Sequence, residues 1–114
     1  MTEIQPRGRV MISEEAIAEL AGHTAMQSYG VVGMEHPGWG SRLRRVFMRG
    51  GQAKGIKVTL EEKHVSIDLY IVVENGTNMR EISKNLADQV TYTVGKHTGL
   101  DIKEVNVHIS NIKL

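Results

Sequence analysis

Residues 65–73 alternate apolar and polar side chains, and this alternation constrains the fold more than any other feature of the chain. The odd positions in this range are all apolar. Ser66, Asp68 and Tyr70 lie between them, and only Val72 breaks the polar series. A period of two residues is typical of a β-strand with one face in the core. We therefore expect Tyr70 and Val72 to lie on the face that points away from the core.

The neighbouring segments predict the remaining elements. Residues 56–61 alternate in the same way and predict a hairpin with its tip near Glu62–Lys63. Ser13 is the predicted N-cap of a helix that runs to about Ser28. A second helix of roughly twenty residues is expected between an N-cap at Thr77 or Asn78 and a stop at Gly99. Further strands are predicted at residues 8–12, at 31–35 and around Val105–Ile109, the last shifting register toward Ile112 and Leu114 through a bulge or fraying.

These elements predict an α+β fold in the order β-α-β-β-β-α-β. In a two-layer sandwich, both helices cover one face of a mostly antiparallel sheet and bury its apolar side. At 114 residues the chain is expected to form a single domain, residues 1–114, with a core that needs no metal or disulfide. There is no cysteine, and no apolar run approaches the roughly 18 residues of a membrane span. We therefore expect a cytoplasmic protein.

Residues 36–54 are predicted to be a basic, irregular insert within this domain. The segment contains five of the 14 Lys and Arg residues and no acid, so the rest of the chain carries a net charge of −4. Leu43, Val46 and Phe47 have helical spacing, which fits a solvated loop whose short helix caps the core. The alternative is a contact surface for anionic lipid, nucleic acid or an acidic protein, formed by Trp39, Arg42, Arg44, Arg45 and Arg49.

Catalytic and metal-binding patterns are absent from the sequence. The five histidines form no HxxH, HxxxH or HExxH pair. His97 is expected at the edge of the core with a hydrogen-bond partner, and His108 is expected to face solvent or a partner. Asp68 is expected to be solvated or paired across strands rather than to act as a general base. We predict no enzyme activity, no cofactor and no metal site.

Several segments together resemble the bacterial alkaline shock protein family of envelope stress response proteins, and in particular its short members encoded beside fatty acid kinase. The resemblance covers about residues 8–112. The segments that carry it are GRVMISEEAI (8–17), AG (21–22), YGVVGM (29–34), KGIKV (54–58), VSIDLYIVV (65–73), NG (75–76), TGL (98–100) and EVNV (104–107).

The resemblance implies a non-enzymatic cytoplasmic scaffold or regulator of the envelope stress type that acts through protein–protein contacts. It further implies a link to fatty-acid and phospholipid metabolism, and peripheral placement at the inner face of the cell membrane through a partner protein. We expect a homo-oligomer, with an edge strand (the first or the last) and the face bearing Tyr70 and Val72 as candidates for self-association. The alternative is direct binding of an anionic membrane surface or of nucleic acid by the basic insert.

Overall fold

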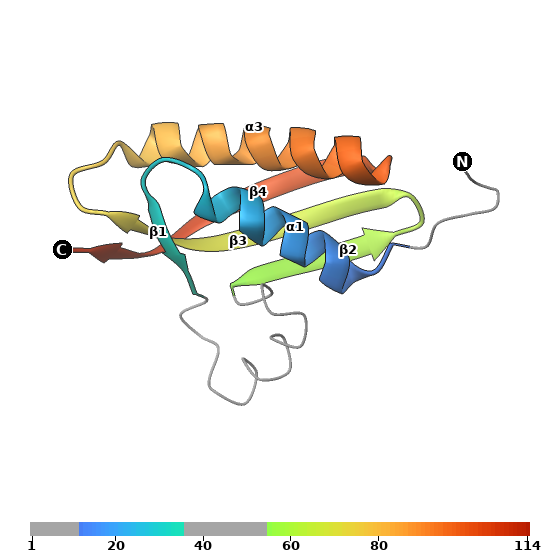
Figure 1. Cartoon of the computed structure of the whole chain (residues 1–114), viewed down its shortest axis with the longest axis horizontal. Helices are drawn as coiled ribbons and strands as arrows, with labels where there is room; N and C mark the ends of the chain where they lie inside the picture. The colour runs from blue at the N-terminus through green and yellow to red at the C-terminus, as the bar shows by residue number, and fades with distance from the viewer. Residues whose placement is uncertain (1–11, 36–54) are drawn as a thin grey trace, which may run out of the picture.

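The computed structural model describes residues 12–35 and 55–114. Within these ranges the elements follow the order α1–β1–β2–β3–α3–β4 (Figure 1). They are α1 (Glu14–Met26), β1 (Val31–Met34), β2 (Ile56–Glu61), β3 (His64–Glu74), α3 (Met79–Thr98) and β4 (Asp101–Lys113). The predicted first strand, residues 8–12, lies outside the described residues except for Ile12, which precedes α1 and packs against the core. The predicted short helix around residues 43–47 also lies outside them.

Both helices begin at the capping residues that the sequence predicts, and α3 also ends at its predicted glycine. The Ser13 side chain accepts a hydrogen bond of 3.0 Å from the N–H of Ala16, and the Asn78 side chain accepts one of 3.1 Å from the N–H of Glu81. These bonds satisfy N–H groups that have no partner within the helix. Gly99 ends α3 in the left-handed conformation, with φ +75°.

β3 is the central strand, and its two edges are occupied differently. β4 runs parallel to it along one whole edge, from His64 opposite Asp101 to Glu74 opposite Lys113. β1 and β2 both run antiparallel to it and share the other edge, β2 beside residues 64–69 and β1 beside residues 71–73 (Figure 1). β1 and β2 are therefore two halves of one edge position, separated in the chain by residues 36–54.

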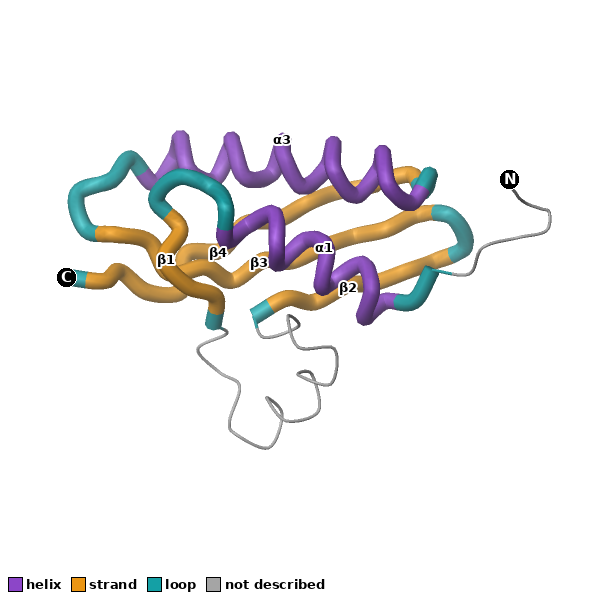
Figure 2. The backbone as a smooth tube through the Cα atoms, in the orientation of Figure 1, coloured by secondary structure: helices purple, strands orange, loops and turns teal. Residues whose placement is uncertain are grey.

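The two helices cover one face of this sheet, as Figure 2 shows. α1 packs against β1, β2 and α3, and α3 packs against β4. The alternating side chains of β3 that point toward the helices are fully buried, and they meet apolar residues of both helices. This core contains Ile17, Ala21, Ala25, Val65, Ile67, Leu69, Ile71, Val73, Ile82, Leu86, Val90 and Val94.

The predicted α+β sandwich, with both helices on one face, is thus confirmed for the described residues. The hairpin tip lies at Glu62–Lys63, as expected, and Glu62 adopts a positive φ of 55° there. The register shift in the last strand is a bulge, because Ser110 is an extra residue between the partners of Ile71 and Val72. α1 ends at Met26, two residues before the predicted end.

Candidate interaction surface

The sheet face opposite the two helices, called the open face from here on, has no described helix or strand packed over it. The even-numbered side chains of β3 point to this face and are partly exposed, in contrast to the fully buried odd-numbered ones. Strand register adds side chains from β2 and β4 on either side, because residues opposite each other share a face. The open face is formed by Lys57, Ser66, Asp68, Tyr70, Val72 and His108.

Three side chains at the centre of the open face hold one another in place. His108 lies beside Tyr70 on the neighbouring strand, and their rings stack with centroids 4.5 Å apart and an interplanar angle of 14°. Nε2 of the same imidazole lies 3.0 Å from Oδ1 of Asp68. The side chains of Asp68 and His108 are 26% and 44% exposed. The cluster is therefore a fixed, polar and accessible surface feature.

Next to this cluster the side chains of the open face are smaller and more apolar. Gly33 of β1 lies opposite Val72, and a Cβ atom added at Gly33 would stand 3.7 Å from the Cβ of Val72. Because the neighbouring strand has no side chain at this position, one flank of Val72 stays accessible. The open face therefore joins an apolar spot to a polar aromatic cluster, a combination common in protein interfaces.

The two residues that flank the segment 36–54 both bond to the backbone of Tyr70. The N–H of Glu35 donates to the Tyr70 carbonyl at 2.8 Å, and the Tyr70 N–H donates to the Gly55 carbonyl at 2.8 Å. The basic insert thus leaves and rejoins the sheet at the middle of β3. The residues predicted as its contact surface, Trp39, Arg42, Arg44, Arg45 and Arg49, lie outside the described residues.

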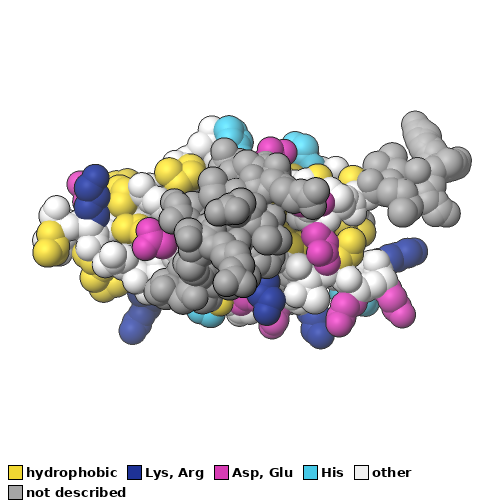
Figure 3. Space-filling view, turned by 90° about the horizontal axis from the view of Figure 1, so that it is seen from below, with side chains coloured by type: hydrophobic (Ala, Val, Ile, Leu, Met, Phe, Trp, Pro, Cys, Tyr) yellow, Lys and Arg dark blue, Asp and Glu magenta, His cyan; other side chains and the backbone are white. Residues whose placement is uncertain are grey.

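Charges of both signs are mixed on the side of the molecule that Figure 3 shows. Figure 3 shows acidic, basic and histidine side chains interspersed with apolar ones around the grey region. Among residues 12–35 and 55–114, no group of three or more His, Asp or Glu side chains could hold a metal ion. No helix in the same ranges has the length and apolar character needed to cross a bilayer.

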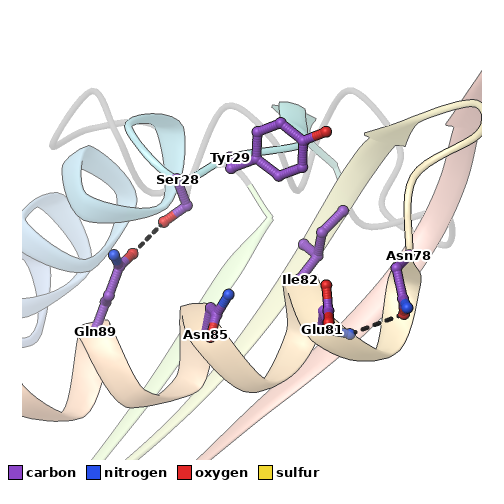
Figure 4. A pocket seen from close by; sticks show the side chains of 7 residues that line it. All are labelled: Ser28, Tyr29, Asn78, Glu81, Ile82, Asn85 and Gln89. Carbon is purple, nitrogen blue, oxygen red and sulfur yellow. Dashed lines mark hydrogen bonds between the residues drawn. The ribbon is translucent and has the colours of Figure 1, made fainter.

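A shallow hollow lies away from the open face, between the end of α1 and the first turns of α3 (Figure 4). The Ser28 hydroxyl bridges its two sides by donating to Oε1 of Gln89 at 2.6 Å. Its volume of about 90 Å³ is well below the roughly 300 Å³ at which small-molecule sites begin. It is lined by Ser28, Tyr29, Asn78, Glu81, Ile82, Asn85 and Gln89.

The structure places Asp68, His97 and His108, three residues that the sequence analysis considered for their chemistry. Asp68 is paired across strands, as expected, and its partner is His108. Sequence reasoning placed His108 at a surface but did not find this pairing, which depends on the parallel register of β3 and β4. His97 has the expected hydrogen-bond partner, with Nδ1 2.8 Å from the Thr93 carbonyl. Its predicted place at the core edge is wrong, because the last turn of α3 leaves the residue exposed.

Comparison with proteins of known sequence gives relatives that span nearly the whole chain. YloU of Bacillus subtilis (strain 168), described as uncharacterized, is 32% identical over 108 residues, which are 94% of this chain and 90% of that protein. A stress response regulator gls24 homolog of Streptococcus pyogenes serotype M3 is 25% identical over 107 residues, which are 94% of this chain but 60% of the relative.

Comparison with solved structures supports the fold alone. The domain titled MamM-CTD H285A superposes with a TM-score of 0.55 at 14% identity, covering 89% of this chain and all of that domain. The sequence itself matches one protein family over residues 2–114, which is almost its full length. The chain therefore belongs to the alkaline shock protein 23 family, which is described as having a cell envelope-related function.

Proposed function

We propose that this protein is a non-enzymatic scaffold or regulator of the envelope stress response, which works by protein–protein contacts made on its open face. The observation that carries the proposal is the fixed cluster of Asp68, Tyr70 and His108 beside Val72. The ring stacking and the hydrogen bond restrain these side chains in the free protein, so less conformational entropy is lost when a partner binds. Family membership and a stress response regulator among the relatives support the envelope role.

The proposal places the protein in the cytoplasm, at the inner face of the cell membrane, where a partner protein would hold it. Its narrower form links the envelope role to fatty-acid and phospholipid supply, following the resemblance to members encoded beside fatty acid kinase. Phospholipid analysis of a strain that lacks the gene tests this narrower form separately, since an unchanged phospholipid composition removes the lipid link and leaves the scaffold function standing.

The main test compares a substitution on the open face with one on the far side of the molecule. Val72→Glu places a charge on the open face, and Thr91→Glu places the same charge on the exposed side of α3. Each variant is first checked for native circular dichroism and then introduced into a gene-deletion strain, whose survival of detergent and cell-wall antibiotic is measured. We expect Thr91→Glu to restore survival and Val72→Glu to fail. Full rescue by folded Val72→Glu would overturn the proposal.

A second candidate function is direct binding of an anionic membrane surface or of nucleic acid by the basic insert. The observation that favours it is that Glu35 and Gly55, which flank the insert, both bond to Tyr70, so the two flanks of the insert lie together on β3. Replacing Arg42, Arg44, Arg45 and Arg49 by Gln should abolish sedimentation with anionic vesicles and any shift of RNA at low salt. Native binding should also weaken steeply as salt rises. Absence of binding by the native protein at low salt would dispose of this candidate.

A further inference from the structure

β4 ends the sheet, and no second strand among the described residues pairs with its outer edge. Alternate residues of a strand direct their backbone N–H and C=O groups toward opposite edges. The Lys113 carbonyl accepts from the N–H of Asn75 at 2.9 Å, so the backbone of Lys113 faces β3 and that of Ile112 faces outward. The Ile112 N–H donates instead to Oδ1 of Asn111 at 2.8 Å. The side-chain oxygen of Asn111 thus occupies the position at the outer edge of β4 where a neighbouring strand would place a carbonyl oxygen.

The apolar side chains of β4 are also less covered than those of β3. Val105, Val107 and Ile109 point to the same face as the fully buried residues of β3, yet they are only partly buried. Ile112 remains 38% exposed. A further strand beside β4 would cover the part of these side chains that the helices leave open.

The sequence of β4 is chemically self-complementary about Val107. Residues opposite each other in an antiparallel pair share one face and interact directly. When two copies pair with Val107 opposite itself, apolar residues meet apolar residues and the charges at the two ends are opposite in sign. The pairs are Ile102 with Ile112, Val105 with Ile109, Asn106 with His108, and Asp101 with Lys113.

The two bulges of β4 fit this register. Bulges normally blunt an exposed edge, because they interrupt the alternation that a new strand must match. Lys103 and Ser110 are the extra residues relative to β3. With Val107 on the symmetry axis, residues 103–104 of one copy lie opposite residues 110–111 of the other. The inward–outward alternation of side chains is therefore interrupted at the same points in both strands. Core-facing residues of one copy stay opposite core-facing residues of the other along the full length.

Neighbouring registers are worse. A shift by one residue places apolar side chains opposite polar ones that point to the other face. A shift by two residues in one direction places Lys103 opposite Lys113, which are like charges. The same shift in the other direction places Ile102 opposite Ser110 and separates Asp101 from Lys113. The pattern therefore selects one antiparallel arrangement.

We infer that the outer edge of β4 is a homodimer interface, in which β4 pairs antiparallel with β4 of a second copy and Val107 lies on the two-fold axis. The inference rests on the proposed scaffold function and names a second copy of this chain as a partner. Pairing joins the two sheets edge to edge, with the helices of both copies on one side. The two open faces then form one continuous surface with two Asp68–Tyr70–His108 clusters.

Cysteine cross-linking tests the register directly, because the native chain has no cysteine. Asn106 and His108 of opposite copies are neighbours on the open face, where the expected Cα separation of about 4.5–5.5 Å suits a disulfide. The double variant N106C/H108C should become a covalent dimer on mild oxidation. Each single variant should stay monomeric on a denaturing gel, since its cysteine faces no other. Equal cross-linking of the singles and the double variant would overturn the register.

A charge exchange tests the interface without cysteine. D101K and K113D each place two pairs of like charges in the dimer, and each should raise its dissociation constant about tenfold at low salt. The double variant D101K/K113D should restore native affinity. D101K also removes the contact of Asp101 Oδ2 with His64 Nδ1 at 3.1 Å, but the double variant lacks this contact too. Restored affinity therefore reports on Asp101 and Lys113 alone.

Sedimentation equilibrium provides the affinities, and the native chain should dimerise reversibly. A native chain that is monomeric at every concentration, or a double exchange that fails to restore dimerisation, overturns the inference. The proposed function fails by a different result, the rescue of the deletion strain by folded Val72→Glu. A monomeric chain whose Val72→Glu variant loses envelope function would therefore refute the dimer and leave the scaffold in place.

Discussion

Glu35 and Gly55 lie next to each other against β3, although residues 36–54 separate them in the chain. Both bond to the backbone of Tyr70, Glu35 through its N–H and Gly55 through its carbonyl. A Cβ atom added at Gly55 would stand 2.7 Å from the Glu35 nitrogen and 3.0 Å from the Tyr70 oxygen. Gly55 also has a positive φ of +77°. Only glycine closes the gap between β1 and β2 without strain.

Gly55→Ala is therefore expected to destabilise the protein more than an ordinary glycine substitution. The left-handed backbone alone costs about 1–2 kcal/mol, and the backbone contacts at Glu35 and Tyr70 cannot relax without moving β1. We expect a loss of roughly 2–4 kcal/mol in the free energy of unfolding, measured by urea denaturation.

Gly76→Ala is the matched control for this prediction. Gly76 has a positive φ of +90°, but a Cβ atom there would meet nothing within 4 Å. Its substitution should cost only the backbone term of about 1–2 kcal/mol. Equal losses for the two variants would show that the close approach of Glu35 to Gly55 contributes nothing to stability.

Most of the described fold could be predicted from the sequence because its signals are local. The alternation in residues 65–73, the caps Ser13 and Asn78, and Gly99 each act within a few residues of where they stand. The division of one edge position between β1 and β2 has no such signal. It depends on both segments pairing with the same edge of β3. This pairing is a non-local interaction that the sequence of neither segment specifies by itself.

The open face was predictable in part for the same reason. Period-two spacing places Tyr70 and Val72 on the face away from the core, and the partly exposed positions of both residues agree with this. The partner of Asp68 could not be found, because His108 reaches it only through the parallel register of β3 and β4. Parallel pairing over a helical crossover leaves no spacing rule in the sequence from which a register can be read.

Leu86→Ala is expected to weaken the junction between α3 and the sheet severely. Leu86 is fully buried in the core, and its truncation leaves a cavity between α3 and the sheet in addition to the lost transfer free energy. A loss of about 2–5 kcal/mol in the free energy of unfolding is expected by chemical denaturation. Thr91→Ala, on the exposed side of the same helix, should change it by no more than about 0.5 kcal/mol. A small effect at Leu86 would contradict the proposed packing of α3.

Asn78→Ala should lower stability through the first turn of α3. The substitution removes the acceptor of the Glu81 N–H, which then has no partner within the helix. A loss of about 0.5–2 kcal/mol is expected, and hydrogen exchange should accelerate in the first turn before the rest of α3. Asn78→Ser keeps a capping oxygen and should retain most of the stability. Unchanged protection at Glu81 in Asn78→Ala would contradict the capping role.

Asp68 and His108 should be coupled energetically, whereas the similar pair of His64 and Asp101 should not. The two pairs have nearly equal contact distances, 3.0 and 3.1 Å, but side-chain exposure is 26% and 44% in the first and 54% and 69% in the second. Greater exposure means stronger solvent screening, and Tyr70 stacking also restrains the His108 ring. The first pair therefore loses less side-chain entropy when its hydrogen bond forms.

Double-mutant cycles measure this difference. Asp68→Ala, His108→Ala and the double variant should give a coupling energy of about 0.5–1 kcal/mol in the free energy of unfolding. The corresponding cycle at His64 and Asp101 should give roughly 0–0.3 kcal/mol. Tyr70→Leu removes the aromatic stack and should lower the coupling of Asp68 with His108 toward that of the exposed pair. If the two cycles gave equal energies, the central cluster would be no more fixed than an ordinary surface pair, and a partner would have to order it on binding.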